Sequence, residues 1–190
     1  YTTSLQSLRR NRTTKRKFIM AYIDTSDIVI NNYGSLIHES FSGGISDIGS
    51  TEVKITASDG ASGDYFGISG SLNENYIVVG AYGDDDNGSF SGSAYLFNFD
   101  GFQKVKLLPS DGAASDYFGI STSIGSGRVV VGAYGDDDKG SASGSAYIFD
   151  LDGNYVAKIF ASDGAADDNY GYSVAAGSNR IVVGARSDDD

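Results

Sequence analysis

The stretch that decides the fold is YIVVGAYGDDD, residues 76–86, because it returns twice at a fixed distance along the chain. It reappears as RVVVGAYGDDD at residues 128–138 and as RIVVGARSDDD at residues 180–190, each time 52 residues further on. Apolar β-branched residues that run into glycine and then into aspartates are typical of a strand that ends in an exposed loop. A period near 50 indicates units that must stack on a neighbour to bury both faces.

The same spacing holds outside this stretch. Asp-Gly-Ala at 59–61 recurs at 111–113 and 163–165, and Tyr-Phe-Gly at 65–67 recurs at 117–119. Alternation and turn residues within one unit predict strands at 66–72, 76–82, 93–98 and 103–108. Four antiparallel strands per period are typical of a β-propeller blade. The sequence therefore predicts an all-β fold, an incomplete propeller of about two and a half repeats.

Two glycines of the unit lie inside predicted strands. Gly67 and Gly80 lack a side chain where inner strands crowd together, which permits a bulge or a close approach of two backbones. We expect close backbone contacts at these positions.

Composition limits the available chemistry. The chain has 190 residues, 26 glycines, one proline and no window apolar enough to span a membrane. Without cysteine it has no disulfide or thiolate zinc site, and its single histidine, His38, is expected to be an ordinary strand residue. Only metals with oxygen ligands remain plausible.

The chain divides into five expected parts. They are a basic N-terminal arm (1–20), a β-hairpin segment or partial blade (21–56), two full repeats (57–108 and 109–160) and a truncated third repeat (161–190). Within the second part, residues 26–41 are expected to form a hairpin that turns at Tyr33-Gly34, and residues 45–55 resemble the last two strands of a blade.

Charge separates the arm from the rest. The arm holds six basic residues before the first acid: Arg9, Arg10, Arg12, Lys15, Arg16 and Lys17. Residues 18–190 contain 8 basic and 25 acidic residues, a net charge of −17. Such a body repels nucleic acid and anionic membranes, whereas the arm is either a solvated tail or a segment that docks on an acidic surface of a larger assembly.

The repeats resemble FG-GAP repeats, the blades of integrin α-subunit propellers and of many bacterial and phage surface proteins. The matching residues are Phe66-Gly67 and Phe118-Gly119 for FG, Gly80-Ala81-Tyr82 and Gly132-Ala133-Tyr134 for GAP with tyrosine in place of proline, and the more divergent Tyr170-Gly171 and Gly184-Ala185-Arg186. The resemblance implies a propeller used for adhesion or ligand recognition, often with calcium. We expect Tyr82 and Tyr134 to contact a partner.

The integrin calcium loop is not carried over, because only short turns at 72–75, 125–127 and 177–179 stand between the FG and GAP strands. Acidic residues lie instead in two other loops, which leave an up-and-down blade at the same end. The candidate Ca²⁺ ligands are Asp84, Asp85, Asp86, Asp136, Asp137 and Asp138 after the second strand, and Asp59, Asp64, Asp111 and Asp116 before the first. The alternative is that these aspartates only cap their own turns.

The function expected from these features is non-enzymatic. A rigid β scaffold with loops rich in Tyr, Ser, Gly and Asp suits a recognition, adhesion or structural module that binds a protein or glycan, on a cell surface, outside the cell or in a virion fibre. Open blade edges would suit a larger assembly or a homo-oligomer. The alternative is a glycoside-processing enzyme that uses paired aspartates, although the chain has no tryptophan to stack on a sugar.

Overall fold

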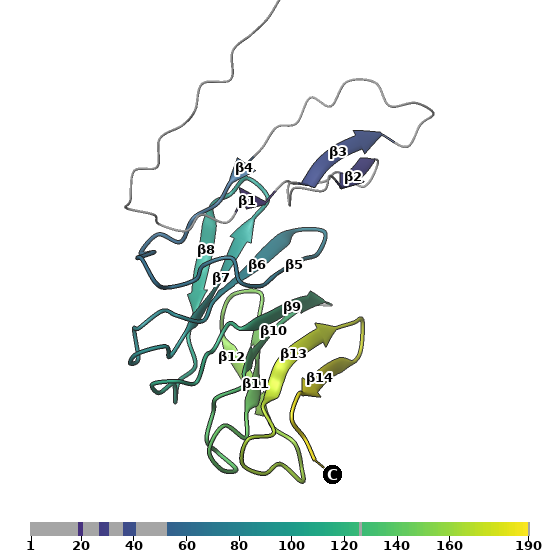
Figure 1. Ribbon diagram of the computed structural model, residues 1–190. Helices are drawn as coiled ribbons and strands as arrows, with labels where there is room; N and C mark the ends of the chain where they lie inside the picture. Colours follow the sequence, from purple (N-terminus) through teal and green to yellow (C-terminus); the bar gives the residue numbers. More distant parts are fainter. Residues whose placement is uncertain (1–18, 21–26, 31–35, 41–52, 126, 190) are drawn as a thin grey trace, which may run out of the picture.

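The structure, a computed structural model, describes residues 19–20, 27–30, 36–40, 53–125 and 127–189. Every regular element in these ranges is a β-strand, and the three sheets between residues 70 and 185 follow one another in chain order (Figure 1). No helix in them is long and apolar enough to cross a membrane. The expected all-β class with blade-like sheets is confirmed.

The first two repeats each form a four-stranded antiparallel sheet in which neighbours in sequence pair with one another. The first sheet contains β5 (Gly70–Leu72), β6 (Tyr76–Ala81), β7 (Ser93–Asn98) and β8 (Gln103–Leu107). The second contains β9 (Ser121–Gly125), β10 (Arg128–Ala133), β11 (Ser145–Asp150) and β12 (Tyr155–Ile159). The third repeat contributes the hairpin of β13 (Tyr170–Ala176) and β14 (Ile181–Ala185).

The predicted second, third and fourth strands of the repeat agree with β6, β7 and β8 to within one residue, but the first strand begins later than expected. β5 starts at Gly70, and the FG pair lies in a turn where Gly67 has φ of 92°. That turn remains tied to the sheet, because Gly67 N–H donates to Gly80 O (2.9 Å) and Gly80 N–H donates to Ser69 O (3.0 Å). Gly67 tolerates this left-handed backbone because it has no side chain, and the regular strand begins after it. In the third repeat the equivalent Gly171 has φ of 91° but lies inside β13, which begins at the predicted position and shifts its register there.

The N-terminal segment forms two further strand pairs. β2 (Asp27–Ile30) pairs with β3 (Leu36–Ser40), which contains His38, as the expected hairpin requires. β1 (Ile19–Met20) pairs with β4 (Val53–Lys54). The basic residues of the arm, the turn at 33–34 and the segment 45–49 lie outside the described residues.

The apolar core lies between successive sheets. On β6, Val78 faces the second repeat, where it belongs to a buried cluster with Phe118 and Val129, while Val79 faces the opposite way and packs in a second cluster with Phe66. Alternate side chains of one strand thus enter two different interfaces, as the two-residue period of a strand requires. The first sheet is therefore buried on one face by the second repeat and on the other by the segment before β5, which supplies Ile55 and Phe66.

Close backbone contact joins the sheets at the predicted glycine. A Cβ added to Gly80 would collide with the carbonyl oxygen of Gly119, and one added to Gly132 would collide with that of Gly171. The expected close approach is therefore confirmed at Gly80, and its partner is the FG glycine of the next repeat.

Backbone hydrogen bonds also fasten the loop after the second strand of one repeat to the loop before the first strand of the next. Tyr117 N–H donates to Phe90 O (3.0 Å) and Phe118 N–H to Ser91 O (3.0 Å). Equivalent bonds join Asn169 to Ala142 and Tyr170 to Ser143. The two acidic loop sets therefore lie at a common end of the sheets, as predicted.

Candidate functional site

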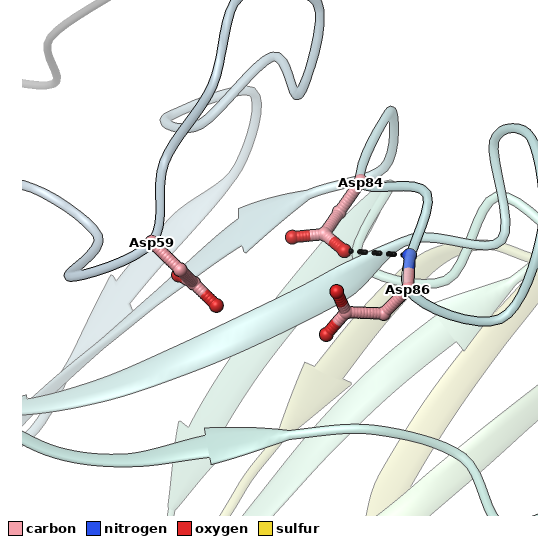
Figure 2. A group of neighbouring side chains, drawn as sticks. All are labelled: Asp59, Asp84 and Asp86. Atoms are coloured by element: carbon pink, nitrogen blue, oxygen red, sulfur yellow. Dashed lines mark hydrogen bonds between the residues drawn. The ribbon is translucent and has the colours of Figure 1, made fainter.

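Three of the candidate aspartates in each of the first two repeats converge on a single point. Carboxylate oxygens of Asp59, Asp84 and Asp86 lie within 4.8 Å of one another, and Figure 2 shows the side chains of this first triad turned toward a shared space. Asp111, Asp136 and Asp138 form the second triad in the same way. The members come from the two loops that the sequence analysis singled out, and each triad could hold a metal ion.

A lysine ammonium lies among the carboxylates of each triad. In the first triad, Lys106 Nζ is 2.8 Å from Asp59, 2.9 Å from Asp84 and 2.6 Å from Asp86. In the second, Lys158 Nζ lies at 2.9 Å from Asp111 and 2.7 Å from both Asp136 and Asp138.

A tyrosine completes each cluster from the neighbouring strand. Tyr95 and Lys106 are directly paired across β7 and β8, so their side chains lie on the same face of the sheet. The Tyr95 hydroxyl lies 3.0 Å from Asp59 Oδ1 and 2.9 Å from Asp84 Oδ2. Its O–H is within hydrogen-bond distance of both carboxylates. Tyr147 and Lys158 repeat this pairing in the second sheet. Each cluster thus joins the third and fourth strands of a sheet to the loops before its first strand and after its second.

The electrostatics follow from this packing. Burial acts to raise the pKa of Asp59, but hydrogen bonds from Lys106 and Tyr95 hold that pKa below its ordinary value of 3.8. Burial likewise acts to lower the pKa of Lys106, and the three carboxylates around it raise that pKa well above its usual range. The lysine and Asp59 therefore stay ionised together across the neutral range.

The remaining candidate aspartates serve their own loops. Asp85 Oδ1 accepts the N–H of Phe90 (2.8 Å), and Asp137 Oδ1 accepts that of Ala142 (2.7 Å). These carboxylates act as the turn caps of the alternative interpretation.

Asp64 and Asp116 also close a turn, since their Oδ2 atoms accept the N–H groups of Ala61 (2.5 Å) and Ala113 (2.7 Å). Asp116 is only 5% exposed, and burial raises its pKa to about 6. Asp168 makes the same bond to Ala165 in the third repeat, so the position has a recurring structural role.

Aromatic rings form a ladder across the loop end of the repeats. Tyr82 stacks on Tyr65 with ring centroids 4.8 Å apart, and Tyr134 stacks on Tyr117 at the same distance. Tyr82 and Tyr117 lie 6.0 Å apart, which links the two stacked pairs, and Phe90 contacts both of those rings. We call these five rings, with Tyr172 beside Tyr134 at 5.5 Å, the aromatic ladder.

The backbone beneath the ladder is conformationally unusual. Tyr65, Phe90 and Tyr117 have φ between 54° and 57°, in the left-handed region that side chains other than glycine rarely adopt. The hydrogen bonds between neighbouring loops hold Tyr117 in this conformation. Residues kept in such conformations are often functional.

The sequence analysis named Tyr82 and Tyr134 but missed Lys106, Lys158, Tyr95 and Tyr147. A signal for them existed, because both pairs are separated by 52 residues and thus obey the period that identified the aspartates. What the sequence did not show is that the lysine of the fourth strand reaches the loop acids.

Comparison with known proteins agrees with this geometry. The profile of the FG-GAP repeat family matches residues 50–97, 102–149 and 154–190, more than half of the chain. A search of curated proteins finds no match. Repeats of this kind typically build non-enzymatic structural or adhesion modules and occur in extracellular or surface proteins. The three consecutive matches, which start 52 residues apart as the repeats do, show that the chain belongs to the FG-GAP repeat family.

Proposed function

We propose that this protein is a non-enzymatic recognition module that binds a basic segment of a partner protein along the aromatic ladder. The observation that carries the proposal is the ladder itself, a row of half-exposed rings that crosses three repeats at the end where the acidic loops emerge. Aromatic side chains with a polar rim are the usual centre of a protein interface.

The surroundings of the ladder favour a cationic partner. The exposed carboxylate of Asp85 lies in the loop that carries Phe90, and the exposed carboxylate of Asp137 lies in the loop that follows Tyr134. The whole chain has a formal charge of −11, so a basic ligand is attracted from a distance. A glycan would use the rings but not the charge.

The third repeat offers an internal example of such binding. Arg186 occupies the position that corresponds to Tyr82 and Tyr134, and its guanidinium lies 4.4 Å from the ring centroid of Tyr172, at the end of the ladder. A guanidinium over an aromatic face is a favourable cation–π contact. We infer that arginines of a partner lie on the other ladder rings in the same way.

This function suits a protein of the extracellular space or a cell surface, where repeats of this kind occur, and it would equally suit a virion protein. The basic arm, which includes Arg9, Arg12 and Lys15, would then attach the module to an acidic part of a larger assembly.

The experiment uses a fluorescein-labelled twelve-residue peptide of alternating arginine and serine, with a citrulline version of the same peptide as the uncharged control. Fluorescence anisotropy should show binding of the arginine peptide that weakens with salt and is absent for citrulline. The double variant Tyr82→Ala/Tyr134→Ala should bind at least about tenfold more weakly.

A matched control is Phe102→Ala, which removes a ring that is 71% exposed in the turn at the opposite end of the first sheet. It should bind as the wild type does. Equal binding of the citrulline peptide would disprove a cationic partner, and full affinity in the tyrosine variant would disprove the ladder as the site. Binding on a glycan array that is lost with Tyr82→Ala/Tyr134→Ala would assign the ladder to sugars instead.

A further inference from the structure

We infer that a lysine ammonium takes the place of a metal ion in the acidic loops, so that the loop face is held together without calcium. Removal of the lysine should turn each triad into a divalent-cation site. The inference concerns the support of the face and does not depend on which ligand binds there.

Each lysine ammonium is surrounded by the three carboxylates of its triad. A lysine ammonium has three N–H donors, and in the first triad Lys106 has three carboxylate acceptors at 2.6 to 2.9 Å. The ammonium is thus satisfied by this triad alone. The second triad has the same arrangement around Lys158, in a different repeat of the chain.

The lysine ammonium excludes calcium from the triad. Ca²⁺ binds oxygens at about 2.3–2.6 Å and needs six to eight of them. The triad oxygens lie within 4.8 Å of one another and already surround Nζ, so calcium and the ammonium cannot share this space. Calcium must therefore displace the lysine before it binds.

Displacement of the lysine by calcium is costly, because the strand holds the lysine side chain firmly in place. Lys106 lies in the hydrogen-bonded register of β8 opposite Tyr95, and its Nζ is 5.3 Å from the centroid of that ring. Its side chain is 15% exposed, and that of Lys158 is 10% exposed. A cation attached to the chain is present at a fixed, high local concentration, whereas calcium must come from solution.

The test compares the wild type with Lys106→Met/Lys158→Met, which keeps the length of the side chain and removes its charge. Thermal unfolding is followed in EDTA and in 5 mM CaCl₂, and calcium binding is followed by titration calorimetry. The wild type should give no binding heat and the same Tm in both solutions. The variant should melt about 10 °C lower in EDTA, because three facing carboxylates lose their cation. It should recover Tm in calcium and bind it with Kd on the order of 10⁻⁴–10⁻³ M.

Lys104→Met is the matched control, since Lys104 lies on the same strand and pairs only with the exposed Asp152 among the carboxylates of the described residues. It should show no response to calcium. If the double variant does not fold, Lys106→Met alone leaves the second cluster intact and gives the same readout. Calcium binding by the wild type with a rise in Tm, or a lysine variant that calcium does not restore, would overturn the inference.

Discussion

The same five residues, Ile-Val-Val-Gly-Ala, form β6 at 77–81 and β14 at 181–185, yet the two strands have different surroundings. Val78 is completely buried, whereas Val182 is 67% exposed. The difference lies in the neighbours, because the second repeat covers Val78, and no sheet among the described residues covers Val182. The face of a blade strand that carries Val78 is therefore buried by the next repeat rather than by its own sheet.

The largest expected effect tests the backbone contact between repeats. In Gly132→Ala, the new methyl group would meet the carbonyl oxygen of Gly171, which belongs to the backbone and has little room to move. We expect a loss of about 3 kcal/mol in the free energy of unfolding, measured by denaturant titration.

Gly184→Ala is the matched change on the exposed strand. Its methyl group would meet only the hydroxyl of Ser173, which can rotate away, so the loss should stay below about 1 kcal/mol. Equal losses in both variants would show that the glycine is required by its own sheet, contrary to the comparison.

A smaller effect is expected when the two equivalent valines are shortened. Val78→Ala should lower the free energy of unfolding by about 2 kcal/mol, because it leaves a cavity in the cluster between the first and second repeats. Val182→Ala should change it by less than about 0.5 kcal/mol. The same denaturant titration measures both variants, and a large loss for Val182→Ala would mean that another surface covers this position.

The smallest effect on stability is expected when the aspartates that pair with Lys106 and Lys158 lose their charge. Asp59 and Asp111 have pKa values held below the ordinary 3.8, so their ionised forms stabilise the fold above that pH, and this contribution is lost as the pH falls through the lowered values. Asp59→Asn/Asp111→Asn should be less stable than the wild type by about 1 kcal/mol at pH 6, a figure reduced for solvent exposure. At pH 2 the difference should disappear.

Asp163→Asn provides the control for this pH series, since Asp163 is the counterpart of these residues in the third repeat and pairs with no lysine of the described residues. Denaturant titrations at pH 2, 4 and 6 should show no pH-dependent difference between this variant and the wild type. A difference at pH 6 that persists unchanged at pH 2 in Asp59→Asn/Asp111→Asn would contradict an ionic origin.

Sequence reasoning succeeded where a local pattern decides the outcome. Alternation and turn residues placed β6, β7 and β8 correctly, and the glycine inside the second predicted strand marked a close backbone contact at Gly80. The same pattern placed the start of the first strand too early in the first two repeats, because Phe66 continues the apolar alternation although Gly67 bends the chain into a turn. Alternation records which residues are apolar and carries no information on φ.

At the site, too, local sequence patterns predicted some features and missed others. The aspartates were recognisable from the two loops in which they recur, but the partner of Asp59 is Lys106, 47 residues away in the sequence. The pairing depends on the register of β7 with β8, which sets the lysine beside Tyr95 and aims it at the loop. A list of acidic residues suggests a metal ion, whereas the register supplies a different cation.

The sequence by itself determined the repeat, the number of strands in each unit and the end of the sheet at which the acids gather, because these depend on residue type and spacing alone. Only the tertiary structure decided which valine of two identical strands is buried and which cation faces the aspartates. Burial and ion pairing both depend on atoms brought together from distant parts of the chain, and no local pattern fixes that contact.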